Sequence, residues 1–448
     1  MIKKRPQTPR EAAAFTLFSI REEGAWSDGA LHHYIARAEL DARDAALASQ
    51  LAFGVLQNRT LCEFYLKAFS SVRLSRLLPR VRDCLDLGVY QLTMMDRIPA
   101  HAAVSETVSL IRHYAHANER TVKYANGVLR ALARAAEDGS LPVLDCPTKE
   151  AYYALRFSHP DWLTHALCEE FGVKEAAAIC ADDNEIAPLC LRVNLLKTTR
   201  DEVLAELRAA GLSCAPHDKI ENLILSKGGS VAALPAFGRG EVTVQDGAGI
   251  VCVDTLAPLP GEYVLDLCAA PGGKTCYIAE KMENRGRVLA CDLHAHKLAR
   301  ICDTAGRLGL SIIETRQADA AVFRPDLEGS ADRVLCDVPC SGLGVIRKKP
   351  EIRWKEEESL RGLPAIQSAI LETACRYVKP GGTLVYSTCT ILRRENFEVV
   401  EKFLKNHPEF TLSPFFHPAV GEISKGYVTL LPHLHQTDGF FIAKLVRL

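Results

Sequence analysis

The sequence predicts a multidomain protein with an all-α helical domain, a small α+β domain and an α/β domain built on a Rossmann-like parallel sheet. Residues 1–140 show only the helical spacing of apolar side chains. A polar, Pro-containing stretch at 137–147 separates them from a mixed segment at 150–236. Over residues 237–448 strand and helix patterns alternate, which is typical of a doubly wound sheet.

Length and composition are those of an ordinary globular protein. The 448 residues allow two or three domains of roughly 150 residues each. Because the formal net charge is −1, a polyanionic partner would have to be held by local basic patches. The 16 cysteines include no C-x-x-C pair, so no zinc ribbon is expected, and reduced thiols are expected instead.

No segment predicts a membrane anchor or an export signal. No stretch approaches the roughly 18 apolar residues of a membrane span. The cationic start, Lys3-Lys4-Arg5, precedes a short apolar run without a small-residue cleavage site, so it does not match a signal peptide. We therefore expect a cytoplasmic protein, monomeric by default, with no membrane and no metal partner.

The first domain begins with Thr8-Pro9-Arg10-Glu11, in which an N-cap Thr, a Pro at the first helical position and a Glu at the third form a capping-box pattern. Asp41 is placed to cap a second long helix. Further helices are predicted at 60–69, 78–94, 102–114 and 121–135. Such a bundle is typical of an interaction module, an RNA-binding module or a scaffold.

The middle segment combines both element types. Ser158–Leu163 begins a helix, and residues 189–194 are predicted to form a strand. Thr199-Arg200-Asp201-Glu202 is a second capping box. Short strands are predicted near Ser213 and Leu223, and the pattern assigns this small α+β unit no function.

The last domain holds the predicted parallel sheet. Its strands are predicted at 263–267, 288–291, 312–316, 333–336 and 383–387, with amphipathic helices over 298–308 and 364–377. The carboxyl ends of parallel strands meet at one edge of the sheet, and ligands bind there in such folds. The residues that follow these strands are therefore the candidates for a functional site.

The turn after the first of these strands predicts a nucleotide-like ligand. It leads from a strand into a helix, so backbone N–H groups face the ligand; its residues are Cys268, Ala269, Ala270, Pro271, Gly272, Gly273 and Lys274. The phosphate-loop motif fails because Cys268 stands where its first Gly is required, and the G-x-G-x-x-G fingerprint is absent. A cofactor without a pyrophosphate, such as S-adenosylmethionine, suits this turn.

Carboxylates end three successive strands. Asp292 lies 292 − 266 = 26 residues after Asp266, at a position where an acid commonly accepts the ribose hydroxyls. Asp319 follows the third strand and could accept the adenine amino group. Any one of these acids is more often a turn or cap residue, but three in register favour a cofactor site.

Two thiols follow the next two strands. Asp337-Val338-Pro339-Cys340 comes after the fourth strand, and Cys389 after the fifth. A single Cys is usually a small buried hydrophobe, whereas two at neighbouring strand ends beside an acid favour a reactive site. A thiolate that adds to carbon 6 of cytosine makes carbon 5 nucleophilic, an acid near N3 stabilises the adduct, and a helper assists release. Cys389, Asp337 and Cys340 supply those residue types.

These motifs resemble those of the RNA cytosine-5 methyltransferases, and within them the chain is similar to the Sun/RsmB type, which methylates small-subunit ribosomal RNA. The matching stretches of the last domain are Leu265–Thr275, Asp337–Gly342, Tyr386–Cys389 and Glu395-Asn396. The N-terminal helices resemble the NusB RNA-binding fold at Pro99, Ala102-Ala103-Val104 and Asn126–Arg130. Ser158-His159-Pro160, Arg192-Val193-Asn194, Val244-Gln245-Asp246 and Asp438–Phe441 also fit, so the resemblance covers essentially the whole chain.

The resemblance implies methyl transfer from S-adenosylmethionine to carbon 5 of a cytidine in 16S ribosomal RNA. It implies that Cys389 is the nucleophile and that Cys340 assists release of the product. The cofactor would be held by residues 268–274, Asp292, Asp319 and Asp337. The chain departs from the family pattern at one place, because the acid usual after Glu395-Asn396 is Phe397 here.

Several alternatives stay open on the sequence. Spacing leaves open which thiol attacks, because a Pro-Cys pair carries the nucleophile in DNA cytosine-5 methyltransferases and would nominate Cys340. The same chemistry on transfer RNA or another ribosomal site is a close alternative. An RNA-binding, antitermination-like adaptor with an inactive methyltransferase domain is a different class, but it would need neither the thiols nor the acids. An exocyclic amino methyltransferase is disfavoured, because Asp337–Cys340 lacks that motif's usual aromatic residue.

A basic loop follows the Cys340 motif. It comprises Arg347, Lys348, Lys349 and Arg353, with Trp354 beside them. Two roles are weighed for it, namely contact with RNA phosphates plus stacking on a base, or an ordinary solvated loop. A target base inside folded RNA would have to be flipped out to reach the thiols.

Overall fold

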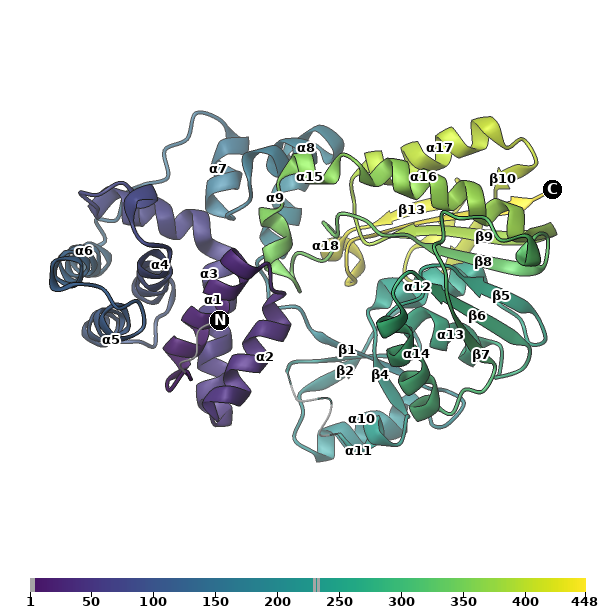
Figure 1. Ribbon diagram of the computed structural model, residues 1–448, viewed down its shortest axis with the longest axis horizontal. Helices are drawn as coiled ribbons and strands as arrows, with labels where there is room; N and C mark the ends of the chain where they lie inside the picture. Colours follow the sequence, from purple (N-terminus) through teal and green to yellow (C-terminus); the bar gives the residue numbers. More distant parts are fainter. Residues whose placement is uncertain (1–4, 229–230, 232–233) are drawn as a thin grey trace. The chain divides into compact units, whose positions relative to one another are not determined.

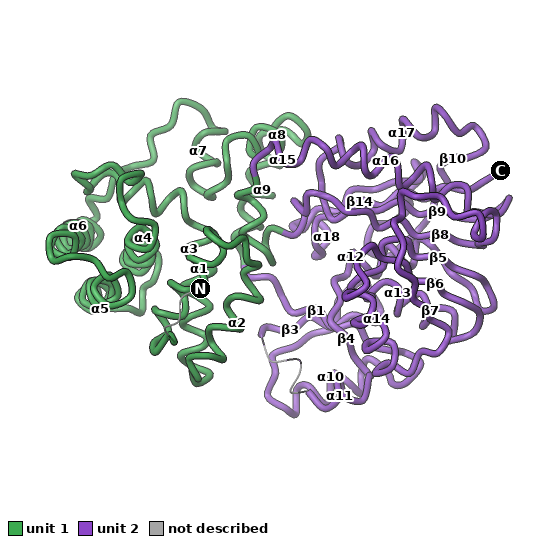
Figure 2. The backbone as a smooth tube through the Cα atoms, in the orientation of Figure 1, with its two compact units in different colours: residues 1–185, 346–355 green, residues 186–345, 356–448 purple. Residues whose placement is uncertain are grey.

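The computed structural model describes residues 5–228, 231 and 234–448, and the chain divides into two compact units (Figure 2). The first unit comprises residues 1–185 and 346–355, and the second comprises 186–345 and 356–448. Segment 346–355 thus belongs to the first unit although both of its sequence neighbours belong to the second. The compact units also place residues 150–185 with the N-terminal helices. The three-part division at 140, 150 and 236 stays a prediction.

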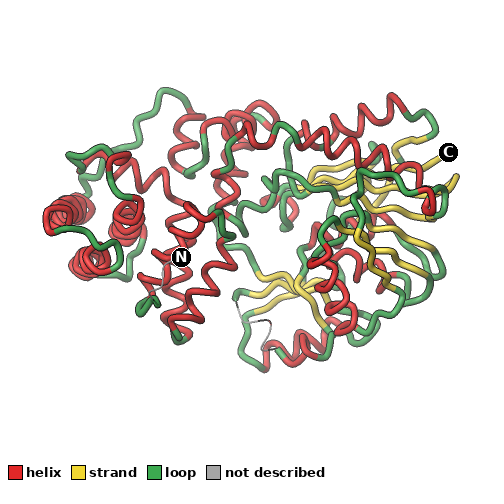
Figure 3. Tube along the Cα trace, in the orientation of Figure 1, coloured by secondary structure: helices red, strands yellow, loops and turns green. Residues whose placement is uncertain are grey.

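The first unit is a helical assembly (Figures 1 and 3). Its α-helices are α1 (Pro9–Glu23), α2 (Ser27–Ala38), α3 (Ala42–Phe69), α4 (Pro79–Met94), α5 (Ala100–His113), α6 (Glu119–Glu137), α7 (Lys149–Arg156), α8 (Asp161–Phe171) and α9 (Val173–Asp182). Helices α1, α3, α4, α5 and α6 each contribute a side chain that is at most 1% exposed to one apolar core: Phe15, Leu51, Leu85, Ile111 and Leu129. This shared core explains why the helical spacing was readable in the sequence.

The helix starts follow the predicted capping chemistry with two differences. The side chain of Thr8 accepts a hydrogen bond from the backbone N–H of Glu11 at 3.2 Å, and that of Asp41 accepts one from Asp44 at 2.8 Å. The Glu11 carboxylate accepts from the backbone N–H of Gln7 at 2.6 Å, so the first box is incomplete. Helix α3 runs through residues 60–69 with a kink at Asn58, so the two helices predicted there are one element.

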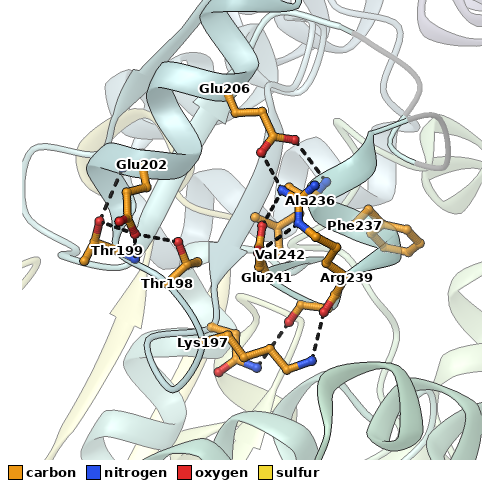
Figure 4. A network of polar contacts seen from close by, with 12 residues as sticks. Lys197, Thr198, Thr199, Glu202, Glu206, Ala236, Phe237, Arg239, Glu241 and Val242 are labelled. Carbon is orange, nitrogen blue, oxygen red and sulfur yellow. Dashed lines mark hydrogen bonds and ion pairs between the residues drawn. The ribbon is translucent and has the colours of Figure 1, made fainter.

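The second unit begins with a small antiparallel sheet of order β2-β3-β1-β4. Its strands are β1 (Leu189–Val193), β2 (Cys214–Pro216), β3 (Leu223–Ser226) and β4 (Val242–Val244), with helices α10 (Arg200–Ala209) and α11 (Pro235–Gly238). The predicted capping box at Thr199 and Glu202 is complete. Figure 4 shows this box beside a polar network in which Arg239 binds Glu206 at 2.5 Å and Glu241 at 2.6 Å. The network fastens α11 to α10.

The second sheet of this unit has eight strands in the order β10-β14-β9-β8-β5-β6-β7, with β13 paired to β14. The strands are β5 (Tyr263–Asp266), β6 (Arg287–Asp292), β7 (Ile313–Gln317), β8 (Ala331–Asp337), β9 (Val378–Thr388), β10 (Phe410–Leu412), β13 (Tyr427–Leu430) and β14 (Phe440–Arg447). Strands β9, β8, β5, β6 and β7 are mutually parallel, as predicted. From β5 the strand order runs outward through β6 to β7, and the chain then returns to place β8 on the other side of β5. The strand order therefore reverses between β5 and β8, and a ligand crevice forms at such a point in these folds.

Helices cover both faces of this sheet (Figure 1). One face packs against α12 (Gly247–Leu256), α13 (Gly273–Lys281) and α14 (Ala295–Leu308), and the other against α16 (Leu363–Ala374) and α17 (Phe397–Asn406). Along β5, for example, Val264 belongs to the first core and Leu265 to the second. This alternation follows from the two-residue repeat of a strand.

The antiparallel strands of the large sheet were not predicted. β14 pairs with β9 over six residues, and β10 and β13 pair with β14. A separate two-stranded sheet joins β11 (Phe415–His417) to β12 (Gly421–Ile423). The predicted fold class is confirmed, with a mixed sheet in place of a purely parallel one.

Candidate active site

The loop after β5 is built around a buried carboxylate. Asp266 is 1% exposed and accepts a hydrogen bond from the Thr275 hydroxyl at 2.7 Å. Burial raises the pKa of Asp266 to about 7. Gly272 adopts a φ of +104°, which an L side chain rarely adopts, so glycine is required where the loop turns into α13.

A cavity of about 240 Å³ opens beside this loop. Most of the predicted cofactor residues line it, namely Cys268, Ala269, Ala270, Pro271, Gly273, Lys274 and Asp337, together with Cys389. Gly272, Asp292 and Asp319 do not appear among its lining residues. Two buried polar atoms of the described residues here lack a hydrogen-bond partner, the Oδ1 of Asp266 and the Nε2 of Gln245. An open acceptor and an open donor beside apolar walls fit the polar groups of an adenosyl cofactor.

The other two strand-end acids are bound locally. Asp292 accepts from the backbone N–H of Ala270 at 3.3 Å and from that of His294 at 2.9 Å, so it braces the cofactor loop from β6. Asp319 is exposed and accepts from the backbone N–H of Ala321 at 2.9 Å. Their predicted contacts with the ribose and the adenine stay predictions.

Lys274 and Asp337 form an ion pair at the cavity wall. The Nζ of Lys274 lies 2.7 Å from an oxygen of Asp337, and the Ser387 hydroxyl donates to the other oxygen at 3.0 Å. The ammonium also lies 5.0 Å from the ring centroid of Phe440. Burial of Lys274 lowers its pKa, but Asp337 and nearby thiols raise it further, so the pKa lies above its usual value. The wall therefore presents a fixed cation and a carboxylate to any bound base.

The two thiols meet as the parallel strands predict. Cys340 lies in the loop after β8, Cys389 directly follows β9, and their Sγ atoms are 3.1 Å apart. The hydrogen bond shared with Cys340, together with the nearby ammonium of Lys274, lowers the pKa of Cys389. The same hydrogen bond, burial and neighbouring carboxylates raise the pKa of Cys340. Cys389 is thus the thiol favoured as a thiolate.

Close backbone packing holds the two thiol loops together. The N–H of Gly344 donates to the Cys389 carbonyl at 3.0 Å, and that of Gly439 donates to the Gly344 carbonyl at 2.8 Å. A Cβ on Gly344 would lie 1.9 Å from the Gly439 carbonyl oxygen, so only glycine fits there. The C-terminal strand region thereby fixes the loop that carries Cys340.

Arg353 of the basic loop has neither role weighed from the sequence, because it can neither contact an RNA phosphate nor lie in solvent. Arg353 is 0% exposed and donates to the carbonyls of Gln57, Phe157, Ser158 and Asp183 and to the Asn184 side chain, all within the first unit. Arg347 pairs with Asp182 at 3.1 Å, and the Trp354 indole donates to the Leu56 carbonyl at 3.4 Å. Lys349 lies 4.9 Å from the centroid of the exposed Trp26 ring. Arg353, whose place in a basic run suggested contact with phosphates, is instead the centre of a buried hydrogen-bond network.

Sequence reasoning assigned no role to several residues of the cavity. These are Gln245, Asp246, Val345, Asp438 and Phe440, which line it, and Ser387, which binds Asp337. A signal was present, because Val244-Gln245-Asp246 and Asp438–Phe441 were among the family-like stretches. The position of Asp438–Phe441 beside the cofactor loop depends on the pairing of β14 with β9, and that of Val244-Gln245-Asp246 follows the pairing of β4 with β1; no local pattern reveals either pairing.

Family models and relatives match this architecture. The model described as 16S rRNA methyltransferase RsmB/F matches residues 253–446, the NusB family model matches 7–134, and a ferredoxin-like domain of the RsmF/B-like methyltransferases matches 159–232. A probable ribosomal RNA small subunit methyltransferase B of Bacillus subtilis is 36% identical over 97% of this chain and 98% of its own. Its counterpart from Citrobacter koseri is 37% identical over 90% of this chain and 91% of its own.

Solved structures agree with the fold. The crystal structure of PH0851 has a TM-score of 0.83 at 28% identity and covers 99% of this chain and 100% of its own. The structure of NSun6 from Pyrococcus horikoshii with SFG, at 24% identity and a TM-score of 0.59, covers 64% of this chain and supports the fold alone.

The fold and the cofactor loop define the class, an S-adenosylmethionine-dependent methyltransferase with a NusB-type helical domain. The chain belongs to the ribosomal RNA small subunit methyltransferase B family. When bound, S-adenosylmethionine supplies an electrophilic methyl group. Among the described residues no group of His, Cys, Asp or Glu could hold a metal ion, and no described helix is long and apolar enough to cross a membrane.

Proposed function

We propose that this protein methylates carbon 5 of a cytidine in 16S ribosomal RNA, with Cys389 as the nucleophile. The observation that carries the proposal is the pair of thiols, 3.1 Å apart, beside the cofactor cavity, with the pKa of Cys389 lowered and that of Cys340 raised. The relatives named above as small subunit methyltransferases support the choice of RNA. That the protein is monomeric and cytoplasmic stays a prediction.

In the proposed reaction the Cys389 thiolate forms a bond to carbon 6 of the cytosine. Asp337 lies at the cavity wall beside Lys274, where it can face N3 and the amino group of the base and stabilise the adduct. Carbon 5 then bonds to the methyl group as the methyl–sulfur bond of the donor breaks. The carbon 5 proton is then lost to solvent water, the electrons of that bond re-form the carbon 5–carbon 6 double bond, and the Cys389–carbon 6 bond breaks to return the thiolate. The role proposed for Cys340, 3.1 Å away, is to assist that release.

The experiment uses unmodified 16S transcript and labelled S-adenosylmethionine with the wild type, Cys389→Ala and Cys340→Ala. Cys302→Ala is the matched control, because Cys302 is an exposed thiol on α14 and does not line the cavity. We expect 5-methylcytidine with the wild type and the control, a loss of at least about 1,000-fold with Cys389→Ala, and a protein–RNA adduct on a denaturing gel with Cys340→Ala.

Each alternative has its own outcome. Persistent methylation by Cys389→Ala, with no adduct for Cys340→Ala, would reverse the two thiol roles. Methylation of transfer RNA but not of the 16S transcript would change the substrate. An adaptor with an inactive methyltransferase domain would show no methyl transfer and no thermal shift with S-adenosylmethionine.

A further inference from the structure

Two buried side chains hold the loop that carries Cys340. Gln367 on α16 and Glu395 are both 0% exposed. The Nε2 of Gln367 donates to the Pro339 carbonyl at 3.0 Å and to a carboxylate oxygen of Glu395 at 2.9 Å. The same oxygen of Glu395 accepts the N–H of Ser341 at 2.9 Å. The peptide groups on both sides of Cys340 are therefore fixed by one amide and one carboxylate.

This clamp also reaches the second thiol. The Ser341 hydroxyl donates to the hydroxyl oxygen of Thr390 at 2.8 Å, and Thr390 directly follows Cys389. The phenol of Tyr386, near the end of β9, donates to the backbone carbonyl of Glu395 at 2.6 Å. The positions of the two sulfur atoms thus depend on the same set of buried bonds.

Geometry alone would not require a charge at Glu395. A glutamine there would offer the same acceptor oxygen to the Ser341 N–H. The second carboxylate oxygen of Glu395 and the Oε1 of Gln367 are buried and have no hydrogen-bond partner among the described residues. An uncompensated buried acceptor destabilises a fold, so its presence beside reactive groups points to a functional constraint.

We propose that Glu395 and Gln367 are positioning residues that keep Cys340 a protonated thiol and direct its S–H at the sulfur of Cys389. The role rests on the proposed function, because it presumes that Cys389 reacts as the thiolate. The carboxylate disfavours a second negative charge on Cys340, and the hydrogen bond it preserves stabilises the charge on Cys389.

The groups that face each thiol agree with this division. Cys340 faces Cys389, Glu395 and Asp337, and all three raise its pKa. Cys389 faces Cys340, Lys274, Asp337 and Asp438, of which Cys340 and Lys274 lower its pKa. Asp337 acts on both sulfurs in the same direction, and Asp438 opposes Lys274 at Cys389, so Glu395 and Lys274 are the charges that favour the thiolate on Cys389 over Cys340.

The test measures the alkylation of each thiol by iodoacetamide against pH, by peptide mass spectrometry on the full-length protein without RNA or cofactor. In the wild type we expect Cys389 to label at lower pH than Cys340. In Glu395→Gln the midpoint for Cys340 should fall by about one pH unit or more and that for Cys389 should rise, so the gap narrows. Gln367→Met keeps the charge but frees the loop, so the Cys389 midpoint alone should rise.

Glu280→Gln is the matched control, because Glu280 is a buried carboxylate of the same unit that pairs with Arg192, and it should move neither midpoint. A folded Glu395→Gln with wild-type midpoints for both thiols overturns the proposal and leaves Glu395 a merely structural residue. If that variant does not fold, an unchanged Cys389 midpoint in Gln367→Met overturns it. Because alkylation needs no methyl transfer, failure of the proposed function in the RNA assay would be seen separately.

Discussion

A buried polar centre in the first unit can be compared with the thiol centre of the second, and the two differ in what their polar atoms bind. In the first unit the guanidinium of Arg353 binds four backbone carbonyls and one side-chain amide, so its hydrogen bonds serve the protein itself. In the second unit the centre around Cys340 and Cys389 keeps open acceptors on Asp266 and Glu395. The Nε of Arg353 also lacks a hydrogen-bond partner among the described residues, so the difference lies in location: the open oxygen of Asp266 belongs to a residue that lines the cavity, where a ligand can bind.

The largest effect should come from Arg353→Met. Loss of the guanidinium leaves several buried carbonyls without a donor, so the free energy of unfolding of the first unit should fall by about 3–5 kcal/mol. Cys389→Ala should change the free energy of unfolding of the second unit by less than about 1 kcal/mol, because it removes one half-buried sulfur. Urea unfolding of both variants measures the contrast. An equal loss in the free energy of unfolding for the two substitutions would contradict the proposed difference between the two centres.

A smaller effect should come from the pH dependence of Asp266. Its pKa is about 7 in the folded protein and 3.8 as the ordinary value, so between these the folded state binds a proton that the unfolded state has released. The contribution of Asp266 to the stability of the second unit is then complete below pH 4 and falls as pH rises to 7, by up to about 4 kcal/mol at 1.36 kcal/mol per unit. Asp266→Asn should flatten this decline, as measured by urea unfolding at pH 5 and pH 8. If the free energy of unfolding falls equally with pH in the variant and the wild type, Asp266 does not cause the decline.

The first unit should show the opposite slope through His159. His159 is 1% exposed, binds Asp183 at 3.2 Å, and has a pKa lowered from 6.5 by burial and by Arg353. The unfolded state then binds the extra proton, so this contribution is complete above pH 6.5 and is lost as pH falls. His159→Gln should remove a slope of about 1 kcal/mol per pH unit below 6.5, which urea unfolding at pH 7 and pH 5.5 would measure. If His159→Gln loses as much stability between pH 7 and pH 5.5 as the wild type does, His159 is not the source of that loss.

The smallest effect should come from Thr199→Ala, which belongs to neither centre. It removes the N-cap of α10 and should lower the free energy of unfolding by about 1 kcal/mol. The alkylation midpoints of Cys340 and Cys389 should not move. A shift in those midpoints would mean that the small antiparallel sheet is coupled to the thiol centre.

The parallel part of the catalytic sheet was predictable because its signals are local. Each strand is a short apolar run with a marked residue at its end, as at Asp266, Cys340 and Cys389, and parallel order then brings those ends together. The 3.1 Å approach of the two sulfurs is a consequence of that order.

The rest was hidden because it depends on distant partners. Arg353 looks like a phosphate-binding cation in a basic run. Nothing near it in sequence reveals the carbonyls that it binds, which lie in α3 and just after the ends of α7 and α9. Phe440 reaches Lys274 only because β14 pairs with β9. Phe397, which replaces the acid usual in the family, stacks on Tyr427 at 4.3 Å and gains a partner from another unpredicted strand.

Segment 346–355 imposes an order on the synthesis of the protein. The other residues of the first unit end at Glu185, but its guanidinium centre arrives only with Arg353. On the ribosome the N-terminal helices therefore emerge and collapse while the carbonyls of Gln57 and Phe157 still lack their donor. The helices can pack around the Arg353 guanidinium only after β5, β6, β7 and β8 have been made. The helical unit is therefore among the first parts to be translated and among the last to be completed.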